Sequence, residues 1–248
     1  MGEIITITDF FLYKRNMRMT TEKNQNIILD LHQKGSYDEM PANADILLAL
    51  FPESNYPVPV IGIAKELGFK VFEDDIEDEA LSGMIAIDHS LNKLFETDKI
   101  IIVNKKDSSE HKRFTIAHEL AHYLFDADHN QDYYNTYQTN ESSWSTDIDH
   151  TNREAVANYF AANLLMPALD FRKKYNKLLQ EYGNTKTGKL QITSQLSSFF
   201  GVPQTAAQIR YKELQLEYLS NTDEEKYMTD IIKSIQVHDA EIRKGMKG

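Results

Sequence analysis

The sequence predicts an α+β domain with a small mixed β-sheet followed by a mainly helical C-terminal half. Short apolar runs at residues 69–72, 83–87 and 99–103 indicate strands. From residue 109 onward, apolar residues instead recur at helical spacing over long segments. Strands first and helices afterwards are typical of the α+β class. Of 248 residues, 41% are hydrophobic and 26% charged, the balance of an ordinary globular protein.

The chain before these strands carries fewer signals. A β-like stretch is expected at residues 4–11 and a helix at about 22–33, and neither shows recognisable chemistry. Residues 1–41 are therefore treated as an N-terminal extension of unknown role. A short helix at residues 59–67 has a proline near its start and Gly68 after its end, the usual asymmetry of helix termini.

Six helices are expected in the C-terminal half. Asp107 and Glu110 have the spacing of a capping box before the first of them. Pro167 ends the second, because the residue before a proline is pushed out of the α region. The expected ranges are 109–126, 152–166, 169–182, 190–200, 204–217 and 223–242.

Composition excludes several classes of site. The chain has no cysteine, which excludes disulfides, a cysteine nucleophile and thiolate metal sites. A bound metal must therefore use imidazole and carboxylate ligands. No apolar run approaches the roughly 18 residues of a membrane span, and the N-terminal basic residues follow the apolar stretch instead of preceding it as in a signal peptide. A cytoplasmic location is expected. The formal net charge of −11 disfavours direct nucleic-acid binding and fits a basic protein partner better.

Metal-ligand chemistry concentrates in the segment Arg-Phe-Thr-Ile-Ala-His-Glu-Leu-Ala-His, which runs from Arg113 to His122. His118 and His122 are four residues apart and so share one helical face. Their ring nitrogens can converge on one ion at about 2.0–2.1 Å, as zinc requires. Glu119 is close enough to reach a water beside that ion and to act as the general base. An apolar stripe places this helix in a core: Ile116, Ala117, Leu120, Ala121 and Leu124.

A third protein ligand is needed to complete such a site. The best candidate is Glu154, in the first turn of the apolar helix expected at 152–166. A competing interpretation is a capping box formed by Thr151 and Glu154, which would commit the carboxylate to backbone N–H groups. Asn158 favours the ligand, because it lies one turn further along the same face. Its side-chain oxygen can accept a hydrogen bond from the far nitrogen of a ligand histidine.

These residues resemble the ImmA/IrrE family of bacterial metallopeptidases. Matches run from Arg113 through His122, from Glu154 with Ala157-Asn158, Phe160-Ala161 and Leu164 through Pro167, and more loosely at 63–64, 67–68, 81–85 and 102–104. The resemblance covers about residues 42–215, and residues 216–248 then form a C-terminal helical extension. The family pattern often has a second Glu where this chain has Val156, a departure that supports Glu154 as the ligand.

The resemblance implies a zincin-like (gluzincin) fold that binds Zn²⁺ and an endopeptidase that cleaves a basic helix-turn-helix repressor. Such a reaction needs a donor for the oxyanion. The eligible residues are Tyr133, Tyr134, Tyr159, His89 and His150. The segment from Phe114 to Asn152 has no Lys or Arg and seven acidic residues, which favours a basic peptide if it is more than a solvated loop. After Asp126 this segment is expected to be a long loop.

Substrate is expected to pair with an edge strand, as extended peptides commonly do. The strand expected at residues 83–87 is the best candidate, because it is short and follows an acidic loop. Gly83, Ile85 and Ile87 are its predicted substrate-binding residues.

Two other functions remain open. A metal-stabilised anti-repressor would bind its partner without cutting it, although Glu119 would then have no role. Residues 190–214 also have the outline of a helix-turn-helix, which would suit a DNA-binding regulator. Lys189, Arg210 and Lys212 supply its positive charge, so packing is the favoured role for these helices.

Overall fold

The computed structural model describes residues 40–49, 51, 55–78, 80–127, 132–138 and 153–214. The elements expected at 4–11, 22–33 and 223–242 lie outside the described residues, as do His150 and Thr151. None of the described helices combines the length and apolar character needed to cross a bilayer.

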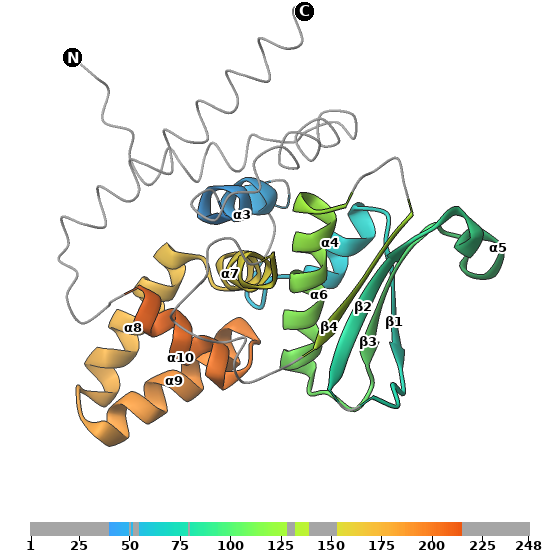
Figure 1. The fold of residues 1–248 in the computed structure, drawn as a ribbon. Helices are drawn as coiled ribbons and strands as arrows, with labels where there is room; N and C mark the ends of the chain where they lie inside the picture. Colours follow the sequence, from blue (N-terminus) through green and yellow to red (C-terminus); the bar gives the residue numbers. More distant parts are fainter. Residues whose placement is uncertain are drawn as a thin grey trace, which may run out of the picture.

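Four strands form a small mixed sheet in the described part of the chain (Figure 1). They are β1 (Lys70–Asp74), β2 (Leu81–Ile87), β3 (Lys99–Asn104) and β4 (Tyr133–Gln138), in the order β1-β3-β2-β4. β1 is parallel to β3, whereas β2 is antiparallel to both β3 and β4. The predicted α+β class with a small mixed sheet is confirmed.

Helices make up the remainder of the described fold. Their bounds are α3 (Met40–Ala49), α4 (Val60–Glu66), α5 (Asn92–Phe95), α6 (Ser109–Phe125), α7 (Arg153–Leu165), α8 (Ala168–Tyr182), α9 (Lys186–Phe200) and α10 (Gln204–Glu213), with a 3-10 turn η2 (His89–Leu91). α6 lies against the sheet, α7 packs on α6 with α3 beside it, and α8, α9 and α10 form the other end (Figure 1). Five of the six predicted C-terminal helices are therefore confirmed, with bounds that differ by a few residues.

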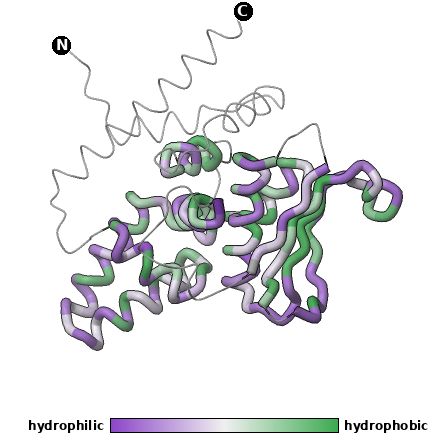
Figure 2. The backbone as a smooth tube through the Cα atoms, in the orientation of Figure 1, coloured by the Kyte–Doolittle hydropathy of each residue, from purple (hydrophilic) through white to green (hydrophobic). Residues whose placement is uncertain are grey.

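The hydrophobic core lies between α6 and its neighbours. Figure 2 shows the central strands as largely hydrophobic, and Ile85, Ile101 and Val103 are buried there. Nearly all of α6 from Phe114 to Leu124 is buried as well. This helix therefore has the sheet on one side and α7 on the other, which explains how its polar side chains come to lie inside the protein.

The helix α6 begins at the predicted residue, Ser109, but its N-cap differs from the prediction by one residue. Ser108, and not Asp107, is the N-cap, and its hydroxyl accepts a hydrogen bond from the backbone N–H of His111 at 3.2 Å. One turn into the helix, the Arg113 guanidinium donates to the Val58 and Gly201 carbonyls at 2.6 and 3.0 Å. α6 is thereby tied to the chain before α4 and to the turn between α9 and α10.

The expectation that residues 83–87 form an edge strand is wrong. β2 is paired on both sides, with β3 and with β4, so its backbone is not available to a peptide. On that side of the described sheet the edge strand is β4, which lies where a long loop is expected after Asp126. The β4 sequence Tyr-Tyr-Asn-Thr-Tyr-Gln is polar on both faces, and periodicity alone therefore does not reveal the strand.

Candidate metal centre

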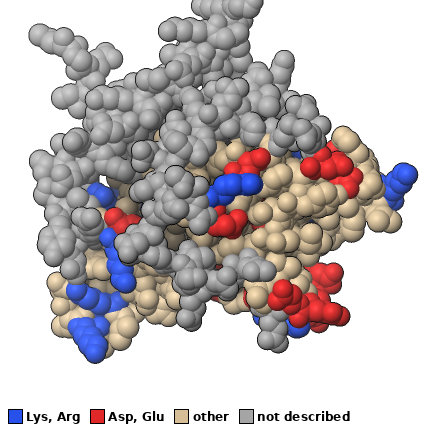
Figure 3. Space-filling view, viewed as in Figure 1, with Lys and Arg blue, Asp and Glu red and all other residues tan. Residues whose placement is uncertain are grey.

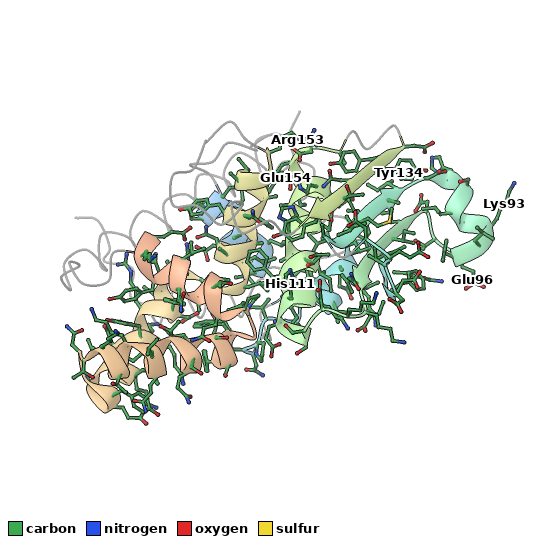
Figure 4. All side chains as sticks on the ribbon, turned by 60° about the horizontal axis from the view of Figure 1, so that its bottom comes forward. Lys93, Glu96, His111, Tyr134, Arg153 and Glu154 are labelled. Atoms are coloured by element: carbon green, nitrogen blue, oxygen red, sulfur yellow. The ribbon has the colours of Figure 1, made fainter. Side chains whose placement is uncertain are left out.

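Three side chains converge between α6 and α7 (Figure 4, where Glu154 is labelled). His118 Nε2 and His122 Nε2 are 2.9 Å apart. Glu154 places Oε2 3.1 Å from His118 Nε2 and Oε1 3.3 Å from His122 Nε2. Ligands about 2.0–2.1 Å from a tetrahedral zinc are about 3.3 Å from one another, so these separations suit a single ion. His118 and His122 are fully buried, whereas the Glu154 side chain is 44% exposed.

The far nitrogens of both imidazoles face oxygen acceptors. His118 Nδ1 lies 2.8 Å from Asn158 Oδ1, and His122 Nδ1 lies 2.5 Å from Asp126 Oδ2. A carboxylate only accepts hydrogen bonds, so Nδ1 of His122 carries the proton, and the Asn158 oxygen assigns the same tautomer to His118. Both Nε2 lone pairs then point at each other and at the Glu154 carboxylate. These three acceptors repel one another unless an added proton or a cation lies among them. A metal ion can bind all three, and this set of ligands fits zinc.

Glu119 is the next residue on α6 and is buried without a hydrogen bond. Neither of its carboxylate oxygens has a partner among the described residues. Burial raises the pKa of Glu119 to about 8, helped by the charge of Glu154, while His122 and the nearby Asn135 amide lower it. A buried carboxylate with unused acceptor atoms and a raised pKa is a stronger base than an ordinary carboxylate, as a general base at neutral pH requires.

The ligands themselves respond to the charge around them. Burial lowers the pKa of His118. Burial also lowers the pKa of His122, but hydrogen bonds with Asp126 and Glu154 more than offset this and raise it to about 9. Burial would raise the pKa of Glu154, yet hydrogen bonds with both histidines hold it well below its usual range. The Glu154 carboxylate therefore faces the two imidazoles. The alternative capping box involves Thr151, outside the described residues.

The inner face of β4 forms a third wall of the site. Alternate strand residues point to the same face, so Tyr133, Asn135 and Tyr137 turn toward α6 while Tyr134 and Thr136 are exposed. The Tyr137 ring stacks on His118 with centroids 3.9 Å apart. The Asn135 amide nitrogen is buried and has no hydrogen-bond partner among the described residues.

Arg153 links this wall to the metal centre from the start of α7 (Figure 4). Its Nε lies 3.1 Å from Asp126 Oδ2, and its terminal nitrogen donates to the Tyr133 hydroxyl at 3.0 Å. Burial and the charge of Asp126 raise the pKa of Tyr133 to about 12, so this hydroxyl keeps its proton. Tyr133 is therefore an oxyanion candidate that Arg153 holds beside the metal centre.

The other oxyanion candidates are placed elsewhere. The exposed Tyr134 donates to Asp88, and His89 pairs with Asp98 at 3.5 Å. Tyr159 packs against the hydrophobic core.

The predicted substrate-binding residues of β2 have structural surroundings instead. A Cβ on Gly83 would lie 2.5 Å from Thr115 Cγ2 and 2.8 Å from the Ile102 carbonyl, so α6 can approach the sheet here only because residue 83 is glycine. Ile85 is fully buried, and Ile87 packs against the core. These positions hold α6, and with it the histidines, against the sheet.

Sequence reasoning missed Asp126, Asn135, Tyr137 and Arg153. Asp126 follows His122 by four residues, a spacing that brings side chains together on a helix and was a usable signal. The contacts of the others depend on the position of β4, for which the sequence carries no comparable signal.

The helices at residues 190–214 pack inward. Arg210, one of their expected positive charges, is 1% exposed and donates to the Met166 carbonyl at 3.1 Å and to Asn163 Oδ1 at 2.7 Å. Figure 3 shows basic side chains at the α8–α9 end and acidic ones at the lower end of the sheet. The exposed acidic residues at that end of the sheet are Glu73, Asp74, Asp75, Glu77 and Asp78.

Comparison with known protein families places more than half of the chain in one family model. The model of the family Peptidase_M78, described as an IrrE N-terminal-like domain, matches residues 64–212. A search of the curated proteins finds no match. The matched span contains α6, β4 and α7, and therefore all the side chains of the candidate metal centre.

Proposed function

This chain belongs to the Peptidase_M78 family, the IrrE N-terminal-like metallopeptidases, and on that basis we propose that it is a zinc-dependent endopeptidase that cleaves a regulatory protein. The observation that carries this proposal is the convergence of His118, His122 and Glu154 beside Glu119, a buried carboxylate without a partner in the described chain. Structural zinc is normally held by four protein ligands, whereas three converge in the described chain. A purely structural site also has no need for a buried base.

The residues of the site have separate roles in the proposed reaction. When bound, zinc supplies a Lewis acid that polarises a peptide carbonyl, lowers the pKa of water toward about 7 and favours the ionised form of Glu119. Glu119 removes a proton from the attacking water and returns it to the leaving amine. Tyr133, held by Arg153 and kept protonated, donates a hydrogen bond to the oxyanion.

Substrate is proposed to pair with β4 in place of β2. In the described chain, β4 pairs with β2 on one side, and no described strand pairs with its other side. An extended peptide added there would run beside the strand whose inner face lines the metal centre. Main-chain pairing tolerates many sequences, so side-chain pockets and charge would select the substrate.

The charge around the site favours a basic substrate. The chain has a net charge of −11, and the segment 114–152 contains no Lys or Arg. A basic helix-turn-helix repressor fits this surface, as the family resemblance implies. Direct DNA binding through residues 190–214 is not favoured, since Arg210 is buried in contacts with α7.

Glu119→Gln tests the proposed function directly. The amide cannot take a proton, so this variant should bind zinc and fold like wild type while cleavage of a repressor falls by at least about 100-fold. Zinc content is measured by elemental analysis, and new N-termini of the repressor by mass spectrometry. His118→Ala is the matched control, because it should lose the metal as well.

Two results would count against the proposal. Cleavage by Glu119→Gln at the wild-type rate would remove the general-base role. A repressor that wild type and Glu119→Gln bind equally well, and that neither cuts, would instead indicate an anti-repressor that acts by sequestration.

A further inference from the structure

Tyr137 makes two contacts that the proposed reaction does not use. It lies on β4 directly opposite Gly83 of β2, and its side chain is 1% exposed. Opposed residues share one face of a sheet, so the ring lies on the α6 side, where Gly83 leaves room for Thr115 of α6. A large polar side chain is thus buried at the one end of β4 that faces the ligand His118.

The ring and the hydroxyl of Tyr137 hold the same imidazole from two directions. The ring stacks on His118 with centroids 3.9 Å apart and planes inclined by 30°. The hydroxyl donates to Asn158 Oδ1 at 3.3 Å, the atom that accepts from His118 Nδ1 at 2.8 Å. Stacking limits the tilt of the imidazole, and the shared acceptor fixes its rotation. No described β4 side chain holds His122 in this way: its Nδ1 faces Asp126, at the end of its own helix.

We propose that Tyr137 is a positioning residue that couples the metal centre to the edge strand β4. It aims His118 at the ion, and metal binding in turn fixes β4 against α6, because one buried side chain belongs to both. This inference rests on the metal centre of the proposed function and not on cleavage. Such coupling is reciprocal: whatever orders β4 raises metal affinity by the same factor as the metal orders β4.

Zinc affinity separates the two contacts. Tyr137→Phe keeps the ring and removes the hydroxyl, and should weaken zinc binding by about 10-fold, the lower end for residues that support a ligand. Tyr137→Leu also removes the stack and should weaken it by about 100-fold. Tyr134→Phe is the matched control, because Tyr134 lies on the same strand, is 55% exposed and donates to Asp88. The measurement is competition with a chromogenic chelator.

Hydrogen exchange gives a readout that a loss of general stability would not produce. Zinc should slow exchange of the backbone amides of 133–138 in wild type and in Tyr134→Phe, relative to those of β1 at the opposite edge. In Tyr137→Phe the zinc-dependent protection of 133–138 should shrink, while β1 stays the same. Substituted cobalt should also show a shifted visible spectrum in Tyr137→Phe, because the geometry of His118 has changed.

The outcomes distinguish this inference from the proposed function. Zinc affinities of Tyr137→Phe and Tyr137→Leu within twofold of wild type would overturn it, as would an equal loss in Tyr134→Phe. If Tyr137→Leu does not fold, Tyr137→Phe and the exchange data still decide the matter. Zinc-dependent protection of β4 in a chain that cleaves no protein would support the coupling and contradict only the peptidase. A wild-type chain that takes up no zinc would overturn both.

Discussion

At the scale of single residues, a substitution of Glu154 distinguishes a metal ligand from a helix cap. Its two oxygens lie 3.1 and 3.3 Å from the two Nε2 atoms, while the alternative role as a helix cap would use backbone N–H groups. Glu154→Ala should weaken zinc binding by more than about 100-fold, beyond the loss typical of supporting residues. Loss of a cap would cost only about 0.5–2 kcal/mol of stability and leave zinc affinity nearly intact. Calorimetric zinc titration with unchanged affinity would favour the cap.

The pKa of His122 predicts how zinc uptake depends on pH. At a pKa of about 9, the metal-free imidazole is protonated at neutral pH, and a protonated imidazole cannot bind zinc. The apparent affinity should therefore fall as the pH drops below about 9, by up to about tenfold per unit from this proton. Asp126→Asn removes a charge that holds the proton, so its affinity curve should shift to lower pH. Chelator competition between pH 6 and 9 measures both, and coincident curves for the two proteins would contradict this account.

At the scale of elements, α6 approaches β2 closely at Gly83. A methyl group on Gly83 would overlap Thr115 Cγ2 and the Ile102 carbonyl, at 2.5 and 2.8 Å. Gly83→Ala should therefore lower the free energy of unfolding by about 1–3 kcal/mol, as overpacking of a core typically does. Thr115→Ser removes the first of these contacts and should restore part of the loss in the double variant.

Urea unfolding provides the measurement for this contact. The double variant should regain stability only in part, since the Ile102 carbonyl belongs to the backbone and cannot move away freely. A single Gly83→Ala variant as stable as wild type would mean that the strand shifts at no cost.

The elements also show which features of the fold can be predicted from sequence patterns. Helical spacing was enough to place His118, Glu119 and His122 on one buried helix, since the geometry of an α-helix is local. Strand order is not local. The sequence predicts β2 as an edge because nothing in its own residues indicates that β4 pairs with it. If β2 were an edge strand, Ile85→Pro would remove only a donor for a bound peptide. Ile85 opposes Ile101 on one side and Asn135 on the other, so this substitution should instead disrupt the sheet itself.

For the whole molecule, net charge should set the salt dependence of the reaction. A chain of net charge −11 attracts a basic substrate over distances that salt screens, with a Debye length of about 10 Å at 0.1 M. The value of kcat/KM for a basic substrate should therefore fall severalfold between about 0.05 and 0.5 M salt. The check is the same cleavage site in a peptide without flanking basic residues, which should respond little. Equal salt responses would assign the effect to something other than steering.

The buried Arg210 bears on how much of the chain the chemistry requires. α7 begins beside the candidate metal centre and runs for about 20 Å. At its other end the Arg210 guanidinium donates to the Met166 carbonyl and to the Asn163 side-chain oxygen. The carbonyls at the end of a helix need hydrogen-bond donors. The metal-site residues His118, His122 and Glu154 lie around the first turn of α7 and supply none at its last. A truncated chain that keeps every ligand but stops after α9 would leave that end of α7 without its cap and uncover the surface on which α10 packs. The minimal catalytic fragment therefore has to extend past Arg210, well beyond the last residue that touches the metal.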